Sequence, residues 1–101
     1  SIKPYRSYIS TRTKNNFVKL IEKINKTIVL EPKELTENGV LHYFLCRINS
    51  YWGLFIKANS YSFLKKAMLK LHTSFYTFYY FEKYKNSWKC KIRKTHLMSY
   101  N

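Results

Sequence analysis

The sequence carries 19 Lys and Arg residues against five Glu and no Asp, a formal net charge of +14 on 101 residues. A single domain of this size repels itself at such a charge unless a polyanion neutralises it. Nucleic acid is the first candidate, because each phosphate that Lys or Arg neutralises releases a condensed counterion. An anionic membrane surface is the second candidate, and a merely soluble basic domain is the third. Hydrophobic residues make up 46% and aromatic residues 19%, so the chain can bury a core and is not expected to be a disordered tail.

The length of the apolar runs and the amino-acid composition indicate where the protein could be located in a cell. The longest apolar runs, residues 40–46 and 76–81, fall far below the roughly 20 residues of a membrane-spanning helix. We therefore expect no membrane span, and no signal peptide or leader is visible. Lys far outnumbers Arg, and Asn, Tyr, Phe and Ile are abundant while Gly, Ala and Pro are scarce. This bias is typical of an AT-rich genome, such as that of an organelle, a parasite or a small bacterium.

Two segments show the i, i+3, i+4, i+7 spacing of apolar residues that indicates an amphipathic helix. The apolar positions are Phe17, Leu20, Ile21 and Ile24 in the first segment, and Leu64, Ala67, Met68 and Leu71 in the second. We expect Thr13 to cap the first helix, which should end near residues 25–26. Asn59 and Ser60 are the expected caps of the second helix.

Five further segments are expected to be strands, from β-branched and aromatic content or from alternation. They are residues 27–30, 40–48, 52–58, 75–84 and 88–93. The second and third should form a hairpin around a turn at residues 49–50. The order α-β-β-β-α-β-β predicts an α+β fold, two helices on a largely antiparallel sheet. We expect a basic extended arm over residues 1–13, the core domain over 14–84 and a basic C-terminal strand or extension over 85–101.

The clearest strand signal also suggests a binding surface. In residues 88–93, Trp88, Cys90 and Ile92 alternate with three cations, which places the cations on one face. That face could follow an RNA backbone, or the lysines could protect an edge strand against aggregation. Together with the arm and the second helix, it supplies the candidate RNA-binding residues. These are Lys3, Arg6, Arg12, Lys14, Lys66, Lys70, Lys89, Lys91, Arg93 and Lys94.

The ten Tyr and seven Phe residues could stack on bases, but most should pack in the core or against a partner. The arm residues Tyr5 and Tyr8 lie between cations and are the expected exceptions.

The residues that could perform chemistry lack the spacing that chemistry needs. Two cysteines (Cys46 and Cys90) and three histidines (His42, His72 and His96) show no zinc-ligand spacing. The thiols are expected to be buried in a protein of a reducing compartment. There is no Asp for a carboxylate pair, and two glycines cannot form a phosphate loop. We expect neither an enzyme nor a bound metal or cofactor.

The order of segments resembles the large-subunit ribosomal protein L-sixteen family. The matching segments are KTIVLEP at residues 26–32 with Thr36, VLHYFL at 40–45, LFIKA at 54–58, residues 63–71 with Ala67, and Thr77 with Phe78. The resemblance covers roughly residues 12–82. It implies an α/β-hammerhead fold, ribosomal RNA and neighbouring ribosomal proteins as partners, and a place near the transfer-RNA site.

Two departures qualify this resemblance. The basic loop of the family is reduced here to residues 33–39, which carry Glu34, Glu37 and one lysine, and this weakens the case for direct contact with transfer RNA. Residues after about Lys83 have no counterpart in the family. A short, AT-biased member would fit the ribosome of the mitochondrial matrix, and its composition would fit a gene encoded in the organelle. The alternative is a basic accessory subunit of an organellar membrane or respiratory complex.

Overall fold

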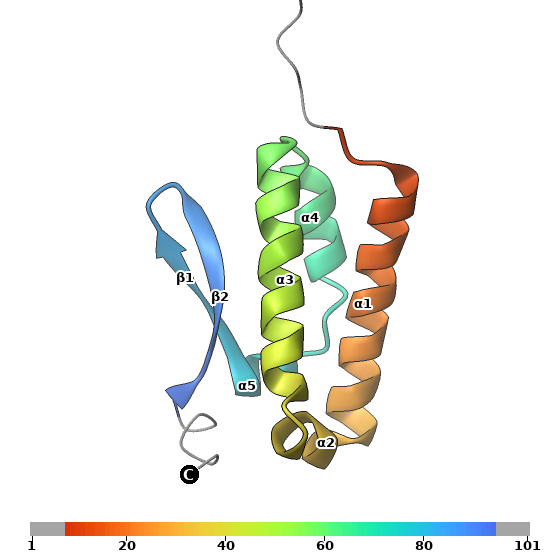
Figure 1. Ribbon diagram of the computed structural model, residues 1–101, viewed down its shortest axis with the longest axis vertical. Helices are drawn as coiled ribbons and strands as arrows, with labels where there is room; N and C mark the ends of the chain where they lie inside the picture. The colour runs from red at the N-terminus through yellow and green to blue at the C-terminus, as the bar shows by residue number, and fades with distance from the viewer. Residues whose placement is uncertain (1–7, 95–101) are drawn as a thin grey trace, which may run out of the picture.

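The computed structural model describes residues 8–94, in which five helices accompany a two-stranded antiparallel sheet (Figure 1). The elements are α1 (Thr11–Leu30), α2 (Pro32–Glu37), α3 (Val40–Lys57), α4 (Tyr61–Met68), α5 (Phe75–Phe78), β1 (Tyr79–Tyr84) and β2 (Ser87–Ile92). The long helix α3 lies between α1 and the hairpin of β1 and β2, and α4 packs against α1 and α3. The α+β class is confirmed, but the predicted seven-element order and the hammerhead architecture are wrong, because the sheet has only two strands.

Helix α1 is longer than predicted at both ends. Its apolar stripe is buried as expected and continues to Ile28, four residues beyond Ile24. Residues 27–30, predicted as a strand, form its last turn despite their β-branched content. Ser10, rather than Thr13, caps the helix, because the Ser10 hydroxyl accepts a hydrogen bond from the Thr13 backbone N–H at 3.1 Å. Residues 11–13 are therefore helical and not part of an extended arm.

The predicted hairpin of residues 40–58 is instead the single helix α3, which ends at Lys57 with Ala58 as its C-cap. Its buried side chains recur every three or four residues, as a helix requires. They are Leu41, Phe44, Ile48, Tyr51 and Phe55. Residues 49–50, predicted as a turn, lie in the middle of this helix. The helix begins after Gly39, whose φ of 70° is the left-handed conformation that glycine adopts without strain.

Aromatic side chains join these helices into one core. Phe17 of α1 lies 5.0 Å from Tyr51 and 5.2 Å from Phe55 of α3, measured between ring centroids. The second predicted helix is confirmed as α4, with Leu64, Ala67 and Met68 buried. Its stripe ends at Leu71, which is also buried, in the segment after the helix.

The C-terminal part of the described chain forms the predicted strand pair, with one change. Residues 75–78 form the short helix α5, and the strand β1 begins only at Tyr79. The fully buried Tyr79 ring stacks on Phe75 at 4.5 Å, and its hydroxyl donates to the Leu41 carbonyl oxygen at 2.7 Å. Strand β2 packs on α3, so residues 87–92 belong to the same packed unit as the helices rather than to an extension.

Candidate nucleic-acid interface

The hairpin presents two faces of opposite character. Directly paired residues of an antiparallel ladder share a face. One face, which we call the inner face, carries the pairs Tyr79–Ile92, Phe81–Cys90 and Lys83–Trp88, and its first two pairs pack against the helices. The other, which we call the outer face, carries the pairs Tyr80–Lys91, Glu82–Lys89 and Tyr84–Ser87. Arg93 follows on the outer face, where its backbone N–H donates to the Phe78 carbonyl oxygen at 2.9 Å.

The outer face places the cations of β2 beside the tyrosine rings of β1. Lys89, Lys91 and Arg93 are exposed, as the alternation of residues 88–93 predicts. The Arg93 guanidinium carbon lies 5.6 Å from the centroid of the Tyr80 ring, and its Nε donates to the Tyr76 carbonyl oxygen at 2.7 Å. These contacts hold the planar Arg93 head in one orientation while its remaining N–H groups stay available to an acceptor.

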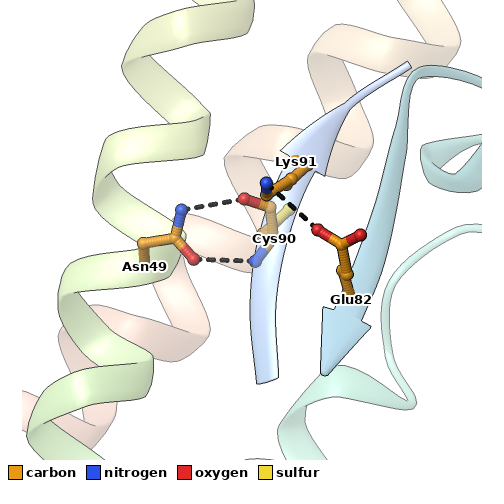
Figure 2. Close-up of polar contacts among 4 residues, drawn as sticks. All are labelled: Asn49, Glu82, Cys90 and Lys91. Carbon is orange, nitrogen blue, oxygen red and sulfur yellow. Dashed lines mark hydrogen bonds and ion pairs between the residues drawn. The ribbon is translucent and has the colours of Figure 1, made fainter. Parts of the chain in front are cut away.

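One acid lies among these cations. The Lys91 ammonium is 3.0 Å from a Glu82 carboxylate oxygen (Figure 2). The hydrogen bond that Lys91 donates to the Glu82 carboxylate, together with the negative charge of that carboxylate, raises the pKa of Lys91. Residues 79–94 carry six cations (Lys83, Lys85, Lys89, Lys91, Arg93 and Lys94) against Glu82 alone. The hairpin therefore keeps a positive excess even with this ion pair formed.

An asparagine of α3 fixes the hairpin against the helices. The Asn49 side-chain amide donates to the Cys90 carbonyl oxygen at 3.0 Å, and its oxygen accepts from the Cys90 N–H at 2.8 Å (Figure 2). Both backbone groups of Cys90 point away from β1, so Asn49 replaces a neighbouring strand at this edge. The contact sets the position of Lys89 and Lys91 on either side of Cys90.

A groove runs between α3 and β2 beside this contact. Its volume is about 400 Å³, and Lys89, Lys91 and Lys94 line it together with His42 and Asn49. Three lysines along one groove give it the charge needed to accept the phosphates of a polyanion.

The remaining predicted cations lie outside the hairpin. Arg12 and Lys14 occupy the first turn of α1, where the Lys14 ammonium lies 5.4 Å from the Phe63 ring centroid. Lys66 is exposed on α4, and Lys70 is exposed in the turn that follows. Lys3, Arg6 and Tyr5 lie outside the described residues. The structure thus brings together Lys89, Lys91, Arg93 and Lys94, and not the whole predicted set.

The cysteines differ in burial. Cys90 is buried, and burial raises the pKa of its thiol to about 12. Cys46 is exposed on α3, so the prediction of two buried thiols is wrong for this residue. In residues 8–94 no group of three or more His, Cys, Asp or Glu side chains could hold a metal ion. His96 lies outside these residues.

The acidic residues gather at the junction of α1 and α2. A hollow of about 560 Å³ there is lined by Glu22, Glu31 and Glu34 with Lys23 and Lys26. A hydrogen bond with Glu31, together with its charge, raises the pKa of Glu34. Residues 33–39, which the sequence analysis compares with the basic loop of the L-sixteen family, thus lie mostly in the short acidic helix α2. The structure therefore gives no support for contact with transfer RNA.

The sequence alone does not identify Tyr80 and Tyr84 as residues of the outer face. Tyr80 and Tyr84 alternate with Phe81 and Lys83, but the run of aromatic residues from 75 to 84 hides that period. Only the register with β2 shows that they share a face with Lys89 and Lys91.

Comparisons with known proteins found no match for the chain. No protein-family model matches it, and neither a curated protein nor a solved structure does. Within residues 8–94, no helix is long and apolar enough to cross a membrane.

Proposed function

We propose that this protein is an RNA-binding structural component of a ribonucleoprotein particle, and that it binds RNA through the outer face of its hairpin. The observation that carries the proposal is the set of exposed cations that β2 places on one rigid face, beside Tyr80 and Tyr84 of β1. Cations fix a polynucleotide by its phosphates, and aromatic rings add stacking that tolerates any base.

The position of the hairpin supports this proposal over simple edge protection. Protective lysines need only stand along a free edge. Here the neighbouring Cys90 backbone is already satisfied by Asn49, so this part of the β2 edge needs no lysine to keep other strands away. The cations nevertheless extend from Lys83 through the turn to Lys94, with no acid between them and only Glu82 beside them.

Within this class, the ribosome is the particle we propose, as a large-subunit protein of a mitochondrial ribosome. What supports it is the charge of +14 on a small chain, the AT-type composition and the order of segments that resembles the L-sixteen family. Membership in that family remains a prediction from sequence. The structure differs in most of the segments that carry it: residues 26–30, 40–45 and 54–57 are helical and not strands, and Thr77 and Phe78 lie in the short helix α5.

Density-gradient sedimentation of the native protein from cells that express it tests this proposal. We expect the protein to sediment with ribosomal particles, to follow the large subunit when magnesium is chelated, and to move to the top of the gradient after ribonuclease treatment. Detergent should change nothing. A protein that floats with membranes and is released by detergent, but not by ribonuclease, would instead be the accessory subunit of a membrane complex.

A further inference from the structure

Under the inner face of the hairpin lies a second hollow, distinct from the groove beside Asn49. It has a volume of about 270 Å³ and is formed by α3, α4, α5 and the two strands. Its floor includes Trp52 and Phe81, whose rings stack at 4.9 Å. Tyr61, Tyr76 and Trp88 line it and keep 41%, 42% and 42% of their surface exposed.

The composition of this aromatic hollow restricts what can occupy it. Its size is below the roughly 300–1,000 Å³ of pockets for drug-sized ligands, and it suits one planar ring system. Lys65 is the charged residue in its lining, and the Lys65 ammonium lies 5.6 Å from the Tyr61 ring centroid. Lys83 pairs with Trp88 on the same face of the hairpin. Flat aromatic walls with cations at the rim complement a planar group that carries negative charge beside it.

We propose that the aromatic hollow binds one unpaired nucleobase of the RNA whose backbone lies on the hairpin, with Lys65 and Lys83 facing the adjoining phosphates. This inference rests on the proposed function. An unpaired base is required, because a base inside a duplex has both of its faces stacked. Trp88 and Lys89 are consecutive on β2, close to the turn at residues 85–86, and they point to opposite faces, so one strand of RNA passing around this turn can reach both surfaces.

The indole of Trp52 gives a second indication. Its Nε1–H is buried and finds no acceptor among the described residues. A buried donor without an acceptor is unfavourable. A base in the hollow brings carbonyl and ring-nitrogen acceptors close to this ring, which is part of the lining.

Two RNA probes test the inference, a blunt 14-base-pair RNA duplex and the same duplex with one bulged uridine. Stacking of one base predicts that the full chain binds the bulged RNA about 5- to 150-fold more tightly than the duplex. Trp88→Leu should remove this preference and leave the affinity for the duplex within about twofold. Tyr43→Leu is the matched control, because Tyr43 is half exposed on α3 and lines neither the groove nor the aromatic hollow.

The outcomes separate the two proposals. Equal affinity for both RNAs, or an equal loss for both in Trp88→Leu, would overturn the nucleobase inference and leave hairpin binding in place. Failure to bind either RNA would overturn the proposed function itself. Circular dichroism should show that Trp88→Leu is folded. If it is not, Tyr61→Leu on α4 tests the same preference without altering the hairpin.

Discussion

Replacing Asn49 by Ala should loosen the hairpin from α3. The change removes the two hydrogen bonds between Asn49 and the Cys90 backbone, at 2.8 and 3.0 Å. Cys90 is 1% exposed, so water cannot readily satisfy the released groups. With about 1 kcal/mol for each lost hydrogen bond and a further contribution from unsatisfied groups, we expect a loss of about 2–3 kcal/mol in the free energy of unfolding. For a domain of this size, that corresponds to a fall in Tm of about 10–20 °C.

Urea and thermal denaturation followed by circular dichroism measure this loss. Ser50→Ala is the matched control, because Ser50 is the next residue of α3 and is exposed. Both replacements raise helix propensity, so the control measures that gain alone. Hydrogen exchange gives a local readout, because the Cys90 amide should lose protection in Asn49→Ala. If the two variants differ by less than about 0.5 kcal/mol, the asparagine does not hold the hairpin.

Three further predictions concern burial. In the folded protein at pH 8, a maleimide should label Cys46 rapidly and leave Cys90 unreacted, and equal labelling would place Cys90 at the surface. Because the pKa of Cys90 is raised, the folded protein keeps a thiol proton that the unfolded chain loses above about pH 9, so stability should fall with rising pH. Between that pH and about 12, the free energy of unfolding of the wild type should fall by about 1.4 kcal/mol per pH unit more than that of Cys90→Ala. Parallel plots of this free energy against pH for the two proteins would contradict the prediction. Ala67→Leu should cost about 1–3 kcal/mol by overpacking, whereas Lys66→Ala should cost less than about 0.5 kcal/mol; equal effects would mean that α4 buries another face.

Periodicity predicts the helices that have one covered face. α1 and α4 each bury a single stripe against the core, so their apolar residues recur at helical spacing and polar residues fill the rest. α3 is covered by α1 and α4 as well as by the hairpin, so Leu45, Trp52 and Ile56 pack outside its main stripe. The resulting apolar runs have no visible period, and a short run of this kind fits a strand equally well.

Contacts between distant segments could not be predicted from local pattern. Asn49 follows a run of apolar residues and precedes Ser50, which is typical of a turn. Its partner, Cys90, is 41 residues away in the sequence. Asn25 is similar, because its side chain accepts from the His72 N–H and donates to the Lys70 carbonyl oxygen, both at 2.8 Å. In each case the tertiary contact, and not the propensity of the residue, decides the structure.

The candidate site is only partly predictable from sequence, because the two strands of the hairpin differ in how clearly their residues alternate. Strand β2 is covered on one face only, so its alternation is strict and predicts the exposed positions of Lys89, Lys91 and Arg93. Strand β1 is aromatic on both faces, because Tyr80 on the outer face contacts Arg93 while Phe81 stacks on Trp52. Its sequence alone therefore cannot tell which tyrosines join the cations.

The salt dependence of RNA binding tests the central claim, that the hairpin and not the net charge binds RNA. Two variants each lose four positive charges by replacement with Gln. One changes Lys89, Lys91, Arg93 and Lys94; the other changes the exposed residues Lys19, Lys23, Lys26 and Lys33 of α1 and α2.

Affinity for an RNA duplex is measured from 50 to 300 mM salt. With about 0.7–0.9 counterions released per phosphate contact, the hairpin variant should lose roughly three units of the slope of log affinity against log salt, and the helix variant less than one. Equal losses in the two variants, or an unchanged slope in the hairpin variant, would contradict the account.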